Sequence, residues 1–269
     1  MCPRLAVIMD VAGTMLQMYR VAKDIPRCRI LHDVITTELV MEKEGRALVI
    51  PQFNPQEVFD APPGMPLSEF FRGREEALRI SCSSTPVDEE AACAILLGSQ
   101  VPMSEIQETL GAVASRCPDF YYATGMIVDA QDSIMSYSIS TGGRPFAGLE
   151  KALKELLAIG AEIYVASGDS PRTVSGLARC PGISMDRIHP ISTPMRKAEI
   201  VSSLKGSYDL VVMVGDGLND IYALEAADIG ILTIQQDTRP SSDLIDAADR
   251  VIRDIGELPA ILRDRLSDM

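Results

Sequence analysis

The sequence predicts an α/β protein with a doubly wound, Rossmann-like parallel sheet at its core, and three observations predict it. First, four apolar runs are continuous rather than alternating, which is typical of parallel strands that helices cover on both faces. These runs are residues 5–9, 161–167, 209–215 and 228–234. Second, helix-forming segments alternate with the last three runs, as in a βαβα series. Third, residues 19–142 break this alternation, so we expect an inserted α+β domain there.

The predicted core therefore consists of residues 1–18 and 143–269, and it contains three helices between its later strands. A helix is expected over 148–161, where leucines recur at helical spacing and a glycine closes the segment. Residues 170–180 and 193–206 each begin with Ser or Thr followed by Pro, the residue types preferred at the N-cap and first helical position.

The inserted domain is predicted less regularly. We expect a hairpin at 36–52, a loop at 54–70, helices at 86–100 and 104–117, and two short strands at 125–140. The hairpin expectation depends on two extended segments around a Glu-Gly pair, and the loop expectation depends on the many prolines of that segment.

Composition limits the classes of partner. The net charge of −13 repels nucleic acid and anionic membranes, and basic residues form no local cluster. No apolar run approaches the roughly 20 residues of a membrane helix, and the N-terminus leads directly into a strand without a signal peptide. The six cysteines form no metal-binding spacing, so we expect them reduced and buried. Together these features predict a soluble, cytoplasmic protein without nucleic-acid or membrane partners.

Polar clusters follow the predicted strands, where ligands bind in open parallel sheets. The clusters are "DVAGT" at 10–14, "SGDS" at 167–170, "RK" at 196–197 and "GDGLND" at 215–220. The last is the strongest single signal, because its two carboxylates offer the oxygen ligands that Mg²⁺ prefers. Asp216 is predicted to ligate the ion directly and Asp220 to hold one of its waters.

These four motifs, in this order, resemble those of the haloacid dehalogenase-like (HAD) superfamily of phosphohydrolases. Over residues 1–18 and 140–250 the chain is most similar to the phosphorylation domain of the P-type ATPases, but it lacks their membrane helices, so a pump is not expected. The resemblance implies that the inserted domain is a cap. It also implies that Asp10 is a nucleophile that forms an aspartyl phosphate, and that Lys197 neutralises developing charge.

The resemblance further implies a Mg²⁺ site made by Asp10, the backbone carbonyl of Ala12 and Asp216, with Asp220 in the second shell. The groups that it implies for phosphate binding are Thr14, Ser167, Gly168, Lys197 and Asn219.

Ala12 departs from most family phosphatases, which have at this position an Asp that acts as the general acid. We therefore expect an enzyme that prefers substrates with good leaving groups, such as acyl, aryl or nucleotide phosphates. One alternative is a phosphonoacetaldehyde hydrolase-like enzyme, whose similar D-x-A-G-T motif works with a cap lysine that forms a Schiff base; Lys23 and Lys43 are the candidates. Another is a non-catalytic phosphate-binding regulatory module. The oligomeric state is not predicted.

Overall fold

The structure is a computed structural model that describes residues 3–117, 121–169, 171–236 and 239–267. The chain divides into two compact units. One contains Met1–Met18 and Arg144–Met269, and the other contains Tyr19–Gly143. Each unit has a six-stranded sheet of its own. We call the first the core unit and the second the inserted unit.

The core unit contains a parallel sheet with β1 at its centre. The strand order is β12-β11-β10-β1-β8-β9, and every neighbouring pair is parallel. The strands are β1 (Leu5–Met9), β8 (Ala161–Ala166), β9 (Ile188–His189), β10 (Leu210–Gly215), β11 (Ile229–Thr233) and β12 (Arg250–Ile252). The predicted doubly wound parallel sheet is therefore confirmed, and all four apolar runs form its inner strands.

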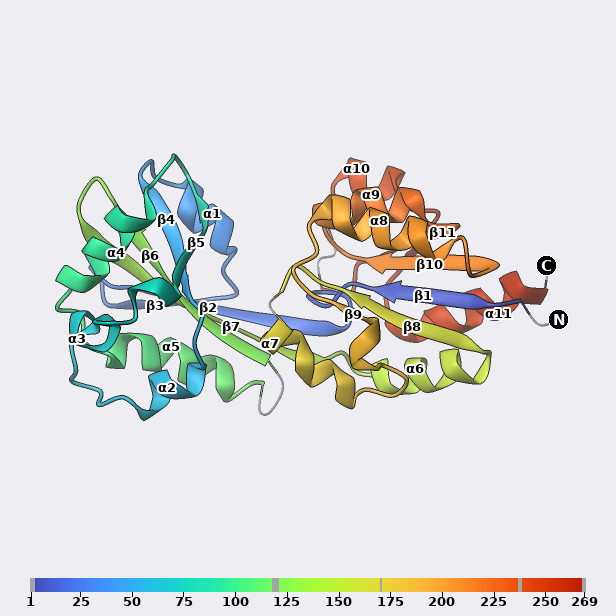
Figure 1. The fold of residues 1–269 in the computed structure, drawn as a ribbon, viewed down its shortest axis with the longest axis horizontal. Coiled ribbons are helices and arrows are strands. Elements are labelled where there is room, and N and C mark those ends of the chain that lie inside the picture. The colour runs from blue at the N-terminus through green and yellow to red at the C-terminus, as the bar shows by residue number, and fades with distance from the viewer. Residues whose placement is uncertain (1–2, 118–120, 170, 237–238, 268–269) are drawn as a thin grey trace. The chain divides into compact units, whose positions relative to one another are not determined.

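Helices cover both faces of this sheet (Figure 1). The helices are α6 (Leu149–Ala158), α7 (Pro171–Val174), α8 (Pro194–Leu204), α9 (Ile221–Ala226), α10 (Ser242–Asp246) and α11 (Leu258–Ser267). Four 3-10 segments connect them: η2 (Ser175–Arg179), η3 (Met185–Arg187), η4 (Leu218–Asp220) and η5 (Ile255–Glu257). Double coverage explains the continuous apolar runs, since all five residues of β1 are fully buried. The helix predicted over 170–180 is shorter than expected, because after α7 it continues as the 3-10 segment η2.

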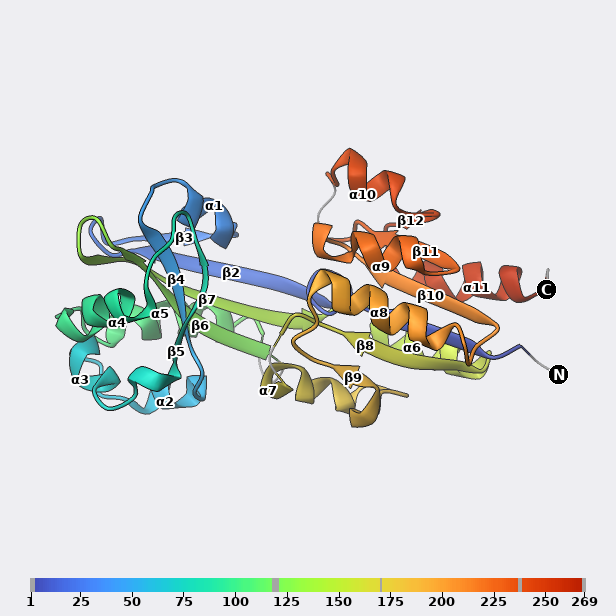
Figure 2. The ribbon, with the colours of Figure 1, turned by 45° about the horizontal axis from the view of Figure 1, so that its top comes forward.

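The inserted unit contains a sheet of order β3-β2-β7-β6-β4-β5, seen in the turned view of Figure 2. Its strands are β2 (Leu16–Asp24), β3 (Arg29–His32), β4 (Arg46–Pro51), β5 (Leu78–Ser83), β6 (Tyr121–Asp129) and β7 (Ile134–Pro145). Its helices are α1 (Thr36–Met41), α2 (Pro55–Asp60), α3 (Leu67–Phe71), the 3-10 segment η1 (Glu75–Ala77), α4 (Glu89–Gly98) and α5 (Ser104–Ala114). Helices α2 to α5 pack on one face of the sheet and α1 packs on the other.

Two predictions for the inserted unit are wrong. The first half of the expected hairpin at 36–52 is helix α1, because Leu39 and Val40 pack into a small core against the sheet. The expected loop at 54–70 contains α2 and α3. Helix α2 begins at a capped N-terminus, where the Asn54 side chain accepts from the Gln56 amide and the Glu57 carboxylate accepts from the Asn54 amide. Pro55 occupies its first position. These short helices show too few turns for a periodic pattern. The helices α4 and α5 are confirmed. The two strands expected at 125–140 are present as β6 and β7, but they are longer than predicted, since β6 begins at Tyr121 and β7 ends at Pro145.

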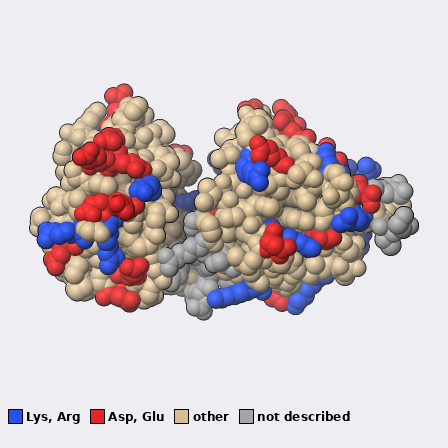
Figure 3. All heavy atoms as spheres, in the orientation of Figure 1, with Lys and Arg blue, Asp and Glu red and all other residues tan. Residues whose placement is uncertain are grey.

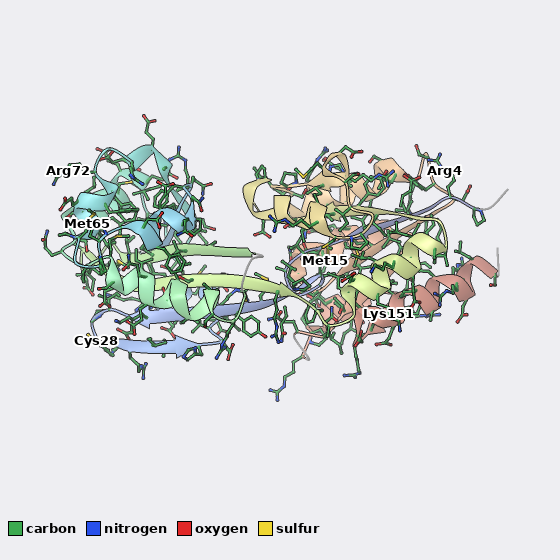
Figure 4. The ribbon with its side chains drawn as sticks, turned by 90° about the horizontal axis from the view of Figure 1, so that it is seen from below. Arg4, Met15, Cys28, Met65, Arg72 and Lys151 are labelled. Carbon is green, nitrogen blue, oxygen red and sulfur yellow. The ribbon has the colours of Figure 1, made fainter. Side chains whose placement is uncertain are left out.

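The cysteines differ in burial, contrary to expectation. The five in the described part of the chain are free thiols, but only Cys117 is buried. Cys28 is exposed in the turn between β2 and β3, where Figure 4 labels it.

The surface of both units mixes acidic and basic side chains, as Figure 3 shows for one face. Among the described residues, no helix is both long and apolar enough to cross a bilayer.

Candidate active site

Three of the four predicted polar clusters follow neighbouring strands of the core sheet. Strand β1 lies between β8 and β10, and all three run in the same direction. One polar residue directly follows each strand: Asp10 follows β1, Ser167 follows β8 and Asp216 follows β10. These residues therefore lie at the same edge of the sheet. The backbone amide of Asp10 donates to the carbonyl of Val214 at 2.9 Å, which ties the end of β1 to β10.

A buried ionic cluster lies at this edge. The Lys197 ammonium donates to Asp10 Oδ1 at 2.6 Å and to Asp220 Oδ1 at 2.7 Å. The Lys197 and Asp220 side chains are completely buried, and that of Asp10 is 6% exposed. A buried lysine between two carboxylates is charge-paired, so the cluster joins α8, β1 and the β10–α9 turn through electrostatics as well as packing.

Helix α8 positions Lys197 through its first turn. Thr193 is the N-cap, its hydroxyl oxygen accepts from the Arg196 amide at 3.2 Å, and Pro194 is the first helical residue, as the sequence predicted. Lys197 shares the buried face of the helix with Ile200 and Val201. The apolar face thus carries the one lysine of α8 towards the sheet edge, while Arg196 pairs with Glu199 on the exposed side.

Asp216 lies against the turn that follows β1. Gly13 has φ +77°, and a Cβ at this residue would overlap the Asp216 carboxylate, so both conformation and space require glycine. The Thr14 hydroxyl donates to Asp216 Oδ1 at 3.4 Å and is itself fully buried. Asp220 Oδ2 accepts from the amides of Asp216 and Gly217, both at 3.1 Å, which fixes the "GDGLND" turn.

The electrostatics of the cluster favour a cation. Burial, followed by the charge of Asp220, raises the pKa of the Asp10 carboxyl well above its usual value, although Lys197 opposes the shift. Burial lowers the pKa of Lys197, but the charges of Asp10 and Asp220 outweigh it, and the net shift is upward. Three carboxylates and one ammonium leave a net charge of −2 when all are ionised, and one oxygen of each carboxylate lies within 4.8 Å of the others.

This donor set fits Mg²⁺, because hard oxygen ligands and a net charge of −2 match a divalent ion. Both oxygens of Asp220 already accept hydrogen bonds, so fewer of its lone pairs are free to bind an ion. The parallel bridge between Ala12 and Leu16 uses the amide of Gly13 and the carbonyl of Val11. The carbonyl of Ala12 therefore forms no hydrogen bond in this bridge.

For the other residues predicted to bind phosphate, the structure describes no contact with this cluster. The Ser167 hydroxyl is buried and donates to Asp169 Oδ2 at 2.7 Å. Gly168 is exposed, and a Cβ would fit there, with only the Ser192 carbonyl at 3.9 Å. Asn219 is exposed and its side-chain oxygen lies over Gly217. Ser170, predicted to cap the next helix, lies outside the described residues.

Three polar residues near the site were not found from the sequence. Asp169 accepts from Ser167, as above. Gln235 donates to the Thr14 carbonyl at 2.8 Å, and Gln236 bonds both backbone groups of Met18. The signal was present, because the two glutamines follow β11, the fourth apolar run. The rule that polar residues after parallel strands share an edge would have included them.

Comparison with known proteins agrees with this architecture. Residues 5–228 match the family model of haloacid dehalogenase-like hydrolases. A curated "soluble P-type ATPase-like phosphatase" of Methanocaldococcus jannaschii is 28% identical over 261 residues, which cover 97% of this chain and 93% of that protein.

Two further likenesses are partial or distant. A cadmium/zinc-transporting ATPase of Arabidopsis thaliana is 39% identical over 85 residues, 32% of this chain but only 9% of the transporter. The structure of a phosphoserine phosphohydrolase-like protein from Francisella tularensis subsp. tularensis superposes with a TM-score of 0.45 at 16% identity, covering 96% of this chain and 99% of that one. The family match spans four of the core strands (β1, β8, β9 and β10), the buried cluster and the inserted unit. The chain therefore belongs to the haloacid dehalogenase-like hydrolase family.

Proposed function

We propose that the protein is a Mg²⁺-dependent phosphohydrolase or phosphotransferase that works through an aspartyl phosphate on Asp10. The observation that carries the proposal is the buried cluster in which Lys197 holds Asp10 at 2.6 Å beside Asp216 and Asp220. A carboxylate nucleophile, an adjacent fixed ammonium and a pair of further carboxylates are the groups that phosphoryl transfer needs for attack and charge neutralisation.

Asp10, Asp216 and the carbonyl of Ala12 would hold the ion, with Asp220 behind them. When bound, Mg²⁺ supplies charge stabilisation to the transferred phosphoryl group and favours the ionised form of Asp10. Asp220 keeps a separate task in this proposal, since its two oxygens orient the Lys197 ammonium and the Asp216–Gly217 peptide.

In the first chemical step a carboxylate oxygen of Asp10 forms a bond to phosphorus as the bond from phosphorus to the leaving oxygen breaks. The leaving group departs with the electron pair of that bond. Lys197 balances the charge on the phosphoryl oxygens. In the second step the oxygen of a water molecule forms a bond to phosphorus as the bond from phosphorus to the Asp10 oxygen breaks. The carboxylate keeps the electron pair of that bond, the water's proton passes to bulk solvent, and inorganic phosphate is released. Thr14, Ser167, the amide of Gly168 and Asn219 are the proposed contacts of the phosphoryl oxygens.

Ala12 determines the proposed substrate preference. An alanine can neither protonate a leaving alkoxide nor activate the water of the second step. Substrates whose leaving groups depart as weak bases are therefore favoured, namely acyl, aryl and nucleotide phosphates. The inserted unit, predicted as a cap over 19–142, is proposed to select among small phosphorylated molecules and to exclude water. A cytoplasmic location and the absence of nucleic-acid and membrane partners stay predictions.

The phosphonoacetaldehyde hydrolase alternative needs a neutral cap lysine, and the ion pairs of both candidates argue against it. Lys23 lies at 2.7 Å from Glu105 and also pairs with Glu108. Burial lowers the pKa of Lys23, but the two glutamates raise it by more than burial lowers it, so the net shift is upward. Hydrogen bonds to Asp129 and Asp132 raise the pKa of Lys43. Both amines are protonated near neutral pH and are poor nucleophiles.

A non-catalytic module would bind phosphate without transferring it, and phosphoenzyme formation separates the two readings. With Mg²⁺ and radiolabelled acetyl phosphate, the wild type should take up acid-stable, hydroxylamine-labile label, and Asp10→Asn should take up none. Phosphate release should fall by several orders of magnitude in the variant, because no neighbouring group replaces the nucleophile. Asp129→Asn is the matched control, since Asp129 is also buried and lysine-paired. Phosphate release by Asp10→Asn at the wild-type rate would refute the proposal.

A further inference from the structure

The turn that carries the proposed nucleophile is held from outside by a glutamine side chain. Within the turn, the amides of Met15 and Leu16 donate to the Val11 carbonyl at 3.0 and 2.9 Å. The Thr14 carbonyl instead accepts from Gln235 Nε2 at 2.8 Å. The opposite end of the same amide, Gln235 Oε1, accepts from the backbone amide of Ile255 at 3.1 Å.

Gln235 thus connects two segments that are far apart in sequence. Ile255 is fully buried at the start of η5, which is fixed by the Asp254 cap and packs against α6 and α11. It offers a rigid anchor. Thr14 is fully buried on the other side, and its hydroxyl reaches Asp216. The peptide plane that Gln235 holds therefore belongs to a residue in contact with the proposed metal-binding carboxylate.

An amide suits this place better than a charged group. It donates and accepts at once, so it satisfies both backbone partners. It is also neutral, so it adds no charge near a cluster whose balance depends on three carboxylates and one ammonium. The adjacent Gln236 makes a similar pair of bonds, to the amide of Met18 at 2.7 Å and to its carbonyl at 2.9 Å. Met18 lies on β2, beyond the turn. Figure 4 labels Met15, which belongs to the turn.

We infer that Gln235 is a positioning residue of the active site, which fixes the Thr14 peptide and through it the 10–14 turn against Asp216. The inference rests on the proposed function. Loss of the bond leaves a turn that samples several orientations, and small displacements of reacting groups reduce the rate strongly while substrate capture changes little.

The test compares Gln235→Leu with Gln236→Leu, because each change removes two side-chain to backbone hydrogen bonds from neighbouring residues. We expect Gln235→Leu to lower kcat for acetyl phosphate by about 10–100-fold with KM within about threefold. We expect Gln236→Leu to keep kcat within about threefold, although both variants lose similar thermal stability. Gln235→Glu retains the bond from Ile255 but cannot, when ionised, donate to Thr14. It should therefore lose kcat as Gln235→Leu does.

A readout without turnover follows from beryllium fluoride, which occupies the phosphoryl position on an aspartate. Its half-saturating concentration, measured by the shift in melting temperature, should rise at least about fivefold in Gln235→Leu and stay unchanged in Gln236→Leu. Equal effects of Gln235→Leu and Gln236→Leu on kcat and on the half-saturating concentration of beryllium fluoride would overturn the inference. Asp10→Asn, run alongside, separates the two failures. If it is inactive while the leucine variants are equal, only the inference falls; if it is active, the proposed function falls and the inference with it.

Discussion

Lys197 in the core unit and Lys23 in the inserted unit each lie between two carboxylates. In the core unit, Lys197 pairs with Asp10 and Asp220, and its side chain is 0% exposed. In the inserted unit, Lys23 pairs with Glu105 and Glu108, with 11% of its side chain exposed. The two lysines have the same kind of partners, but the solvent exposure of those partners differs.

The difference lies in where the surplus negative charge can be solvated. Glu108 is 47% exposed, so water screens the surplus carboxylate of the inserted unit. In the core unit both partners of Lys197 are buried, and Asp216 adds a third carboxylate within 4.8 Å. Of these three carboxylates only Asp216 is more than slightly exposed, so water has limited access to the surplus charge, and burial of an unpaired ion is costly. The comparison teaches that the same lysine–carboxylate pattern is a structural bridge where it is hydrated and a candidate cation site where it is buried.

The strongest way to break the comparison is to remove the cation. We expect EDTA to abolish phosphate release and Mg²⁺ to restore it, and we expect Asp216→Asn to lower kcat/KM by about 10³-fold or more, because charge stabilisation worth several kcal/mol is lost. Added Mg²⁺ should also raise the melting temperature of the wild type but not that of Asp216→Asn. Full activity in EDTA would contradict the charge argument.

The second prediction exchanges each lysine for methionine. Lys197→Met should lower kcat by about 10²–10³-fold, since a fixed charge at the phosphoryl group disappears. It should also lower the unfolding free energy by about 3–5 kcal/mol, because two buried carboxylates lose their partner. Lys23→Met should keep kcat within about threefold. Steady-state kinetics and urea unfolding of both variants measure these effects. Equal kinetic losses would show that the two clusters do not differ in role.

Ala12→Asp sharpens the comparison by adding a fourth carboxyl group to the core cluster. Ala12 is half-buried. Acid–base assistance is typically worth about 10²–10⁴-fold, and it matters most for strongly basic leaving groups. We expect the variant to hydrolyse alkyl phosphates at least about tenfold faster than the wild type, with little gain for p-nitrophenyl phosphate. The measurement is the slope of log kcat/KM against leaving-group pKa. A wild type that cleaves alkyl and aryl esters equally fast already has an acid, and our account of Ala12 would then be wrong.

The smallest expected effect is the absence of a reaction. The pKa of Lys23 is raised above its ordinary value of 10.5, so the amine stays protonated until the pH rises through that raised value. Borohydride with an aldehyde substrate should therefore trap no adduct on Lys23 or Lys43 at neutral pH. Peptide mass mapping, with Lys151 as an exposed reference lysine at 83% side-chain exposure, provides the check. An adduct on Lys23 exceeding that on Lys151 would favour the phosphonoacetaldehyde hydrolase alternative.

Much of the core unit was predictable because its signals are local. Continuous apolar runs marked four strands, and Thr193 with Pro194 marked the start of α8. The inserted unit was less predictable. Helices α1 and α2 have six residues each, too few for a helical period to stand out, and the packing of Leu39 and Val40 decides where α1 forms.

The sequence by itself determined which chemistry is possible: Asp10, Asp216 and Lys197 lie at strand ends or on a capped helix, and parallel strands bring their carboxyl ends to one edge. Only the tertiary structure decided how the side chains are paired. Asp220 uses both oxygens on Lys197 and the turn amides, and the Ser167 hydroxyl donates to Asp169. The Gln235 side chain donates to the Thr14 carbonyl, although the two residues are 221 positions apart in the sequence. The physical reason is that periodicity and capping act over a few residues, whereas the partner of a buried polar group is set by elements that meet only when the chain has folded.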